Sequence, residues 1–180
     1  VTVKNVKVTN SYISGDILAG AVICYAADGI GNVTFDSCVV TNCYIATRKD
    51  THPWAISAVG LYGGGSTATQ ITISNCIVYG NNMNASSGSA NFGTNNEGGY
   101  GSSAFVGHHS TSNTSALIKV SNSIAIGVAP WPVNSQYWSR MCSNYTNVYT
   151  DIDLSENKAK TETGYNGSVY DVSSVITKKA

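Results

Sequence analysis

Stretches in which apolar and polar residues alternate recur along the chain, and this period of two predicts β-strands. In residues 71–74 (ITIS) the two isoleucines would point to one face of a sheet and the two hydroxyls to the other. Segments of this kind begin at Val1, Val33, Ile71 and Ile118. No window of comparable length carries an apolar stripe at helical spacing, so the pattern predicts an all-β fold.

The four segments also match one another residue for residue. Aligned at their first residues, they give two apolar columns and one polar column between them. The apolar columns hold Val3, Phe35, Ile73 and Val120, and Val8, Val40, Val78 and Ala125. The polar column, which we expect at a corner between two short strands, holds Asn5, Ser37, Asn75 and Asn122. A chain that repeats one strand pair in this way is most simply interpreted as a β-solenoid whose coils lie on top of one another.

The spacing between the starts of the four segments grows along the chain, from 32 to 38 to 47 residues. The additional residues follow the second strand of a copy, at 47–54 and at the Asn/Ser/Gly-rich 85–101. Insertions in a solenoid collect on one edge, which often carries binding. We therefore expect about four to five irregular coils in residues 1–147, with long loops on one edge. Residues 148–180 turn polar and are expected to be a C-terminal cap or a connector.

Composition narrows the class of partner. Charged residues make up 11% of the chain, against roughly a quarter in ordinary soluble domains. Ten acidic and ten basic residues give no net charge, so no basic surface for nucleic acid or anionic lipid is expected. No apolar run approaches the roughly 20 residues that span a bilayer, which argues against membrane insertion.

The repeat resembles a known family. A small apolar strand, a short gap, and then Ile-Ser-Asn-Cys before a Tyr-containing strand is similar to the GLUG repeat of bacterial surface proteins. The third copy is nearest, with residues 57–60 (SAVG) and 71–76 (ITISNC), while the fourth has Ser123 in place of the cysteine. The resemblance covers residues 1–128. It implies a right-handed parallel β-helix in a secreted or cell-surface protein of the adhesin type, and it brings no catalytic residues to this chain.

Five cysteines cannot all pair with one another. Cys38 and Cys76 share a column, which places them one coil apart at about the 4.8 Å strand spacing. Two small residues stacked in the ladder is the favoured interpretation, although a Cys24–Cys43 or Cys38–Cys76 bridge would suit an exported chain. No Cys/His cluster argues for zinc, and no cofactor is expected.

Catalysis on polysaccharides would need clustered carboxylates. In the predicted register Asp36 faces Lys4 and Ser74, so no stack of carboxylates forms there. The run Asp151-x-Asp153-x-x-Glu156 resembles the opening of a calcium loop but lacks its glycine, and a solvated turn is favoured. His108 and His109 are adjacent and would point to opposite faces of a strand, so a surface turn is again the simpler interpretation. We therefore expect no enzyme.

Exposed aromatic rings can stack on sugar faces or anchor a protein partner. Trp54 and Tyr100, with His52 nearby in sequence to Trp54, are the candidate ligand or glycan contacts in the predicted loops. Candidate glycosylation sites are the five sequons at Asn32, Asn84, Asn113, Asn144 and Asn166.

Three functions remain open. The first is a non-catalytic structural or adhesive module of an extracellular surface protein, with a variant that assembles into a filament through exposed coil ends. Its partners would be further copies or other surface-protein domains. The second is a glycan-binding module that uses the loop aromatics. The third, a polysaccharide lyase or hydrolase, is the least favoured because the carboxylates are scattered.

Overall fold

The structure is a computed structural model in which residues 1–15, 18–20, 25–26, 32–47, 55–57, 59–62, 70–85, 104–108, 117–128, 145–151 and 176–178 are described. All regular structure in this part of the chain is β-strand, and every strand pair is parallel. The all-β expectation is thereby confirmed for these residues. None of them belongs to a helix that is long and apolar enough to cross a membrane.

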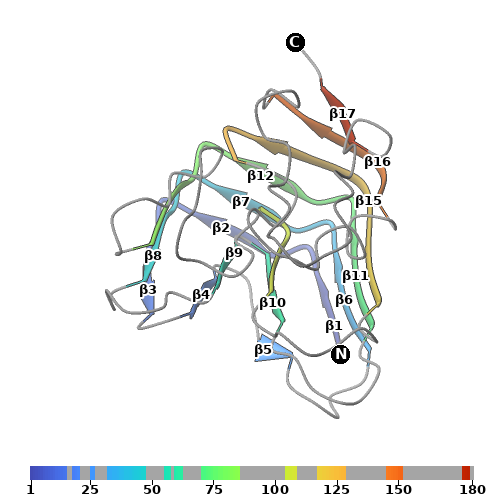
Figure 1. The fold of residues 1–180 in the computed structure, drawn as a ribbon, viewed down its shortest axis with the longest axis horizontal. Coiled ribbons are helices and arrows are strands. Elements are labelled where there is room, and N and C mark those ends of the chain that lie inside the picture. The colour runs from blue at the N-terminus through green and yellow to red at the C-terminus, as the bar shows by residue number, and fades with distance from the viewer. Residues whose placement is uncertain are drawn as a thin grey trace, which may run out of the picture.

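The strands fall into four sheets (Figure 1). The largest contains β1 (Thr2–Lys4), β6 (Val33–Asp36), β11 (Gln70–Ser74), β15 (Leu117–Ile126), β12 (Ile77–Tyr79), β7 (Val39–Thr41), β2 (Lys7–Thr9), β16 (Tyr145–Thr150) and β17 (Ile176–Lys178). The second and third contain β14 (Val106–His108), β10 (Gly60–Tyr62) and β5 (Tyr25–Ala26), and β13 (Asn82–Ala85), β8 (Tyr44–Thr47) and β3 (Tyr12–Gly15). The fourth pairs β4 (Leu18–Gly20) with β9 (Ala55–Ser57).

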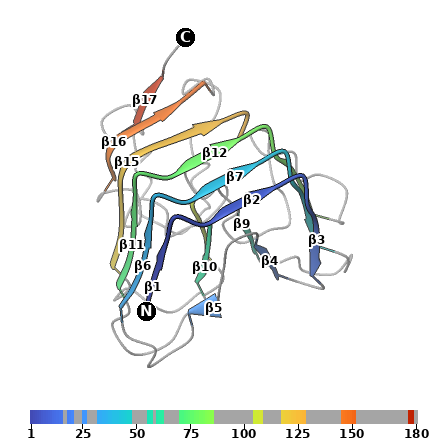
Figure 2. The same ribbon diagram turned by 180° about the vertical axis from the view of Figure 1, so that it is seen from behind.

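The largest sheet bends sharply, because β15 pairs with β11 along its first part and with β12 along its second. We call the strands β1, β6, β11 and the start of β15 the first wall. The strands β2, β7, β12 and the end of β15 form the second wall, and β3, β8 and β13 form the third. Figure 2 shows the first and third walls descending from the two ends of the second.

Strand register follows the columns of the repeat. On the first wall Val3 lies opposite Phe35, Phe35 opposite Ile73, and Ile73 opposite Val120. On the second wall Val8, Val40, Val78 and Ala125 are paired in the same order. The ladder also extends further, because Tyr145 pairs with Val120, and Thr150 with Ala125. The boundary expected between residues 147 and 148 therefore falls inside β16.

The walls meet at residues with positive φ. The first corner holds Asn5, Ser37, Asn75, Asn122 and Asn147, with φ between 49° and 57°. The second corner holds Asn10, Asn42, Gly80 and Gly127, with φ between 52° and 74°. Asparagine and glycine tolerate this left-handed conformation better than other residues, so the sequence can place a turn there in every copy.

Corner backbone amides continue the ladder through the bend. The Asn5 amide donates to the Asp36 carbonyl at 3.0 Å, and the Asn10 amide donates to the Thr41 carbonyl at 3.2 Å. Equivalent bonds recur in the next copy, where the Ser37 amide donates to the Ser74 carbonyl at 3.0 Å. The backbone hydrogen bonding between copies is thus not interrupted at these corners.

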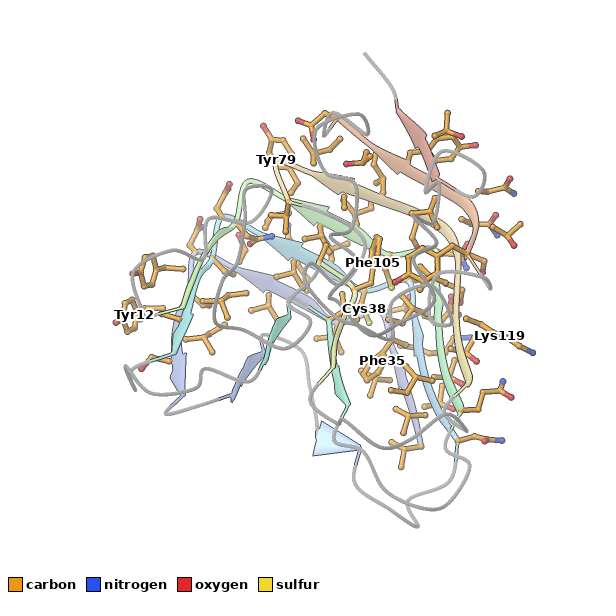
Figure 3. All side chains as sticks on the ribbon, in the orientation of Figure 1. Tyr12, Phe35, Cys38, Tyr79, Phe105 and Lys119 are labelled. Carbon is orange, nitrogen blue, oxygen red and sulfur yellow. The ribbon has the colours of Figure 1, made fainter. Side chains whose placement is uncertain are left out.

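The core fills the space between the walls. Inward side chains of the middle copies are almost fully buried, with Phe35 at 1% exposure and Ile73 and Val40 at 0%. Phe105 and Val59, from segments outside the three walls, are also fully buried. Figure 3 shows Phe35, Cys38 and Phe105 pointing toward the middle of the molecule. Alternation of the strands is thus what separates core from surface.

Candidate interaction surfaces

Asp36 is the centre of a polar cluster on the outer face of the first wall. Its Oδ2 lies 3.0 Å from Lys4 Nζ in the preceding copy. Its Oδ1 accepts hydrogen bonds from Asn75 Nδ2 at 2.8 Å and Ser74 Oγ at 3.1 Å in the following copy. Ser37 Oγ donates to the same oxygen at 3.3 Å. One carboxylate therefore joins three successive copies across their strands.

These contacts change the acidity of Asp36. Hydrogen bonds from Asn75 and Lys4 lower the pKa of Asp36 from 3.8 to about 2, with help from Ser74 and the Lys4 charge and against partial desolvation. The carboxylate is therefore ionised over the whole physiological range and committed to neighbouring side chains. Held in this way, the carboxylate links neighbouring copies of the repeat.

Cys38 and Cys76 occupy one column behind the first corner, and both are free thiols, as is Cys43 behind the second corner. Each of the three thiols donates a hydrogen bond to a backbone carbonyl. Burial raises the pKa of the Cys76 thiol from 9.0 to about 11. A hydrogen bond from the Cys38 backbone opposes this increase, whereas the Cys38 side chain and the Asp36 charge add to it. The structure thus has stacked small residues where a Cys38–Cys76 bridge was the alternative; Cys24 lies outside the described residues.

In later copies, two buried polar side chains replace these cysteines. Ser123 occupies the column of Cys38 and Cys76, and Asn81 occupies the column of Cys43. Ser123 Oγ accepts a hydrogen bond from the Cys76 amide at 3.1 Å. Asn81 Oδ1 accepts one from the Cys43 amide at 2.9 Å, and Asn81 Nδ2 donates to the Val40 carbonyl at 2.9 Å. Each side chain satisfies a buried backbone amide just after a corner. Ser123 was visible in the sequence as the replacement for a cysteine, but its acceptor role was not.

Two tyrosines stack on the outer face of the third wall. The rings of Tyr12 and Tyr44 are 5.1 Å apart between centroids and 5° from parallel. Tyr12, in the first copy, is 73% exposed. Figure 3 places Tyr12 at the periphery of the molecule, away from Phe35 and Phe105. The pair is an aromatic surface that the loop-based prediction did not include.

The outer face of the second wall is polar in the first copy, with Lys7 and Thr9, and is mostly apolar in the later copies. Ile77 and Tyr79 are 43% and 52% exposed, and Val39, Ile124 and Ile126 beside them are half-buried. The outer face of the first wall is polar instead, with Thr2, Thr34, Thr72 and Lys119 in one column. The two faces therefore differ in the kind of contact that they offer to water or to a partner.

The predicted loop contacts Trp54, Tyr100 and His52 lie outside the described residues, as does His109. Asp151 is exposed, and its Oδ1 accepts a hydrogen bond from the Gly127 amide at 2.8 Å. Within the described part of the chain, no three His, Cys, Asp or Glu side chains are grouped so that they could hold a metal ion.

Of the predicted glycosylation sites, Asn32 is exposed immediately before β6, and Asn84 lies in β13. Asn113, Asn144 and Asn166 lie outside the described residues. In the part of the chain that the structure describes, these surfaces lie on an all-β fold built from parallel sheets. Comparison with protein-family models, with curated proteins and with solved structures finds no match to the chain.

Proposed function

We propose that the chain is a right-handed parallel β-helix of the GLUG-repeat type that serves as a non-catalytic structural or adhesive module of a secreted or cell-surface protein. The observation that carries this proposal is the continuous register of the ladder. The column of Val3, Phe35, Ile73, Val120 and Tyr145 runs through five successive passes of the chain. A stack of this kind offers long, regular outer faces and contacts only between neighbouring copies, which suits a spacer or a scaffold.

The commitment of Asp36 supports the non-catalytic part of the proposal. A carboxylate held by Lys4, Ser74 and Asn75 joins copies of the repeat and has its pKa lowered to about 2, far from the value of a general acid or base at neutral pH. Buried thiols such as Cys76, with a pKa raised to about 11, are likewise poor nucleophiles.

Two experiments test the proposal. Incubation with a panel of neutral and acidic polysaccharides should release no new reducing ends and no unsaturated products. Product formation that disappears in Asp151→Asn would contradict the non-catalytic assignment. Antibody labelling of intact cells that produce the protein should show it at the surface or in the medium, and label found only after lysis would contradict the extracellular assignment.

A glycan-binding module is the second candidate, and the Tyr12–Tyr44 pair favours it, because a flat exposed ring surface suits the face of a sugar. A glycan array read with the unaltered chain, Tyr12→Ala and Trp54→Ala tests this candidate. Retention of a sugar that either substitution abolishes would support it. An array without any retained sugar would contradict it.

A further inference from the structure

The outer face of the second wall carries an apolar patch in its middle copies. Ile77 and Tyr79, both in β12, are 43% and 52% exposed. Figure 3 shows Tyr79 on the outside of the second wall, away from Phe105. The apolar patch consists of these two residues and their half-buried neighbours in β7 and β15, namely Val39, Ile124 and Ile126. The patch lies on the side of the stack, so further copies at either end of the stack would leave it uncovered.

Two opposite charges flank the apolar patch along the stack. Lys7 is exposed in β2 and lies in the column of Ile77, two copies before it. Asp151 is exposed directly after β16 and lies in the column of Tyr79, two copies after it. The face is therefore positive on one side of the patch and negative on the other, which makes it complementary to its own reverse.

We propose that the apolar patch binds the apolar patch of a second copy of this chain, about a twofold axis that lies between the two faces and runs along β12. In this arrangement Ile77 and Tyr79 lie over the same residues of the second copy. On either side β7 lies over the end of β15, and β2 over β16, so that Lys7 comes beside Asp151 of the second copy. The proposal rests on the repeat stack put forward above and adds a partner and its geometry.

Three features of the face fit this occupant. An axis along β12 keeps the strands of the two walls aligned, as is usual where sheets pack face to face. The most exposed apolar residues, Ile77 and Tyr79, lie at the centre of the contact, where the surrounding strands exclude water. Each lysine at position 7 meets a carboxylate, whereas a uniform lipid surface would not match charges of opposite sign at the two ends of one patch.

The size of the face predicts a weak pair. The strands β2, β7, β12, β15 and β16 extend over roughly 20 Å at the usual strand spacing, and three residues of each cover roughly 10 Å. This is well below the roughly 800 Å² per partner of a standard interface, so we expect a dissociation constant that is micromolar or weaker. Such a contact suits chains that are displayed side by side on one surface, where the effective concentration is high.

Sedimentation equilibrium of the 180-residue chain, carried to the highest soluble concentration, tests the proposal. The expected result is an equilibrium of monomer and dimer without larger species. Ile77→Lys brings two like charges together at the axis and should raise the dissociation constant by roughly tenfold or more. Thr146→Lys is the matched control, because it adds the same charge at an exposed position beside Ser121, away from the patch, and should leave the constant unchanged.

A charge exchange tests the orientation of the second copy. Lys7→Glu places a carboxylate beside Asp151 twice in each dimer and should weaken the pair several-fold. The double variant Lys7→Glu with Asp151→Lys restores opposite charges and should regain most of the lost affinity. A double variant that binds no more tightly than Lys7→Glu would overturn the proposed geometry.

Other outcomes would overturn the pairing as a whole. These are a monomer at every concentration, open-ended growth, an unchanged constant for Ile77→Lys, or an equal loss in Thr146→Lys. Flotation of a monomeric chain with phosphatidylcholine vesicles, abolished by Ile77→Lys, would assign the patch to lipid instead. Far-ultraviolet circular dichroism separates the two levels of failure: a strand-rich spectrum without a dimer overturns only the pairing, whereas a spectrum without strands overturns the repeat stack itself.

Discussion

At the scale of single residues, the corners bear the backbone strain of the fold. Every described corner residue has a positive φ, and asparagine or glycine fills all but one of these positions. Five of these residues donate their amides to a backbone carbonyl of the next copy, namely Asn5, Asn10, Ser37, Asn42 and Asn75. The positive φ thus determines which residue types a corner can hold. The outward residue next to a corner, such as Asp36, can instead make side-chain contacts between copies.

The two corner glycines separate conformational strain from crowding. A Cβ at Gly80, where φ is 64°, would lie 2.6 Å from Asn42 Oδ1, whereas a Cβ at Gly127, where φ is 74°, would have no neighbour within 4 Å. Gly127→Ala should therefore cost only the left-handed penalty, about 1–2 kcal/mol. Gly80→Ala should cost more, because Asn42 must also move. Urea denaturation measures both, and a smaller loss for Gly80→Ala would contradict the stacking of Gly80 on Asn42.

The low pKa of Asp36 makes the stability of the stack depend on pH in one direction. Because the pKa in the folded state is about 2 and lies below the unfolded value of about 3.9, the stabilisation is fully present above roughly pH 4–5. It is lost as the pH falls toward 2. Nuclear magnetic resonance titration should give the low pKa directly, and Asn75→Ala should raise it toward 3.8. Asp36→Asn should lose less stability between pH 5 and pH 2 than the unaltered chain; an equal loss would contradict the cluster.

The buried Cys76 thiol gives a chemical test of the interior. Since its pKa is raised to about 11, iodoacetamide at mildly alkaline pH should leave Cys76 unmodified in the folded protein and should modify it after denaturation. Mass spectrometry of the peptide that contains Cys76 measures both states. Rapid modification of the folded protein would mean that the first corner is open to solvent.

At the scale of the strand, position in the stack decides how much an inward side chain contributes. Val3 and Val120 belong to the same column, but Val3 is half-buried in the first copy and Val120 is 0% exposed. Val120→Ala should therefore destabilise the protein by about 2 kcal/mol, and Val3→Ala by less than half as much. Chemical denaturation measures the free energy of unfolding of both variants, and so compares the same loss of methyl groups at a buried and at a half-buried position. Equal losses would contradict the exposure of the first copy.

Much of the strand arrangement was accessible from the sequence, because alternation and repetition reinforce each other in residues 1–10, 33–42, 71–80 and 118–127. The alternation of apolar and polar residues predicted the all-β class. The repetition of the segments predicted which residues share a column. β16 (Tyr145–Thr150) was not predicted as a ladder member, because YTNVYT lacks the Ile/Val alternation, and its corner residue Asn147 is recognisable only once the register is known. The second corner was missed as well, since Asn10, Asn42, Gly80 and Gly127 mix two residue types that share only a tolerance of positive φ.

The surfaces were harder to predict than the strands. The Asp36 contacts with Lys4 and Ser74 follow from register alone, and the structure has them as the sequence suggested. The Tyr12–Tyr44 stack and the roles of Ser123 and Asn81 depend on side-chain geometry within one column, which a pattern of residue types does not specify. Contacts predicted at Trp54, Tyr100 and His52 stay predictions, because they lie outside the described residues.

At the scale of the whole molecule, the claim on which everything else depends is the residue-for-residue stacking of the copies. Val8, Val40, Val78 and Ala125 should form a continuous column of methyl groups across the second wall. Neighbours in this column are about 4.8 Å apart in the hydrogen-bonding direction, while second neighbours are about twice as far. Each member should therefore be in close contact only with the copy before and the copy after it.

Methyl nuclear Overhauser effects on a valine- and alanine-labelled sample test this stacking most directly. Strong effects are expected between Val8 and Val40, between Val40 and Val78, and between Val78 and Ala125, with none of comparable strength between Val8 and Val78. A slip of one residue would turn the column to the opposite face of the wall. Loss of the Val40–Val78 effect would contradict the stack, and so would an effect from Val40 to Ile77 in its place in a second sample that is also labelled at isoleucine.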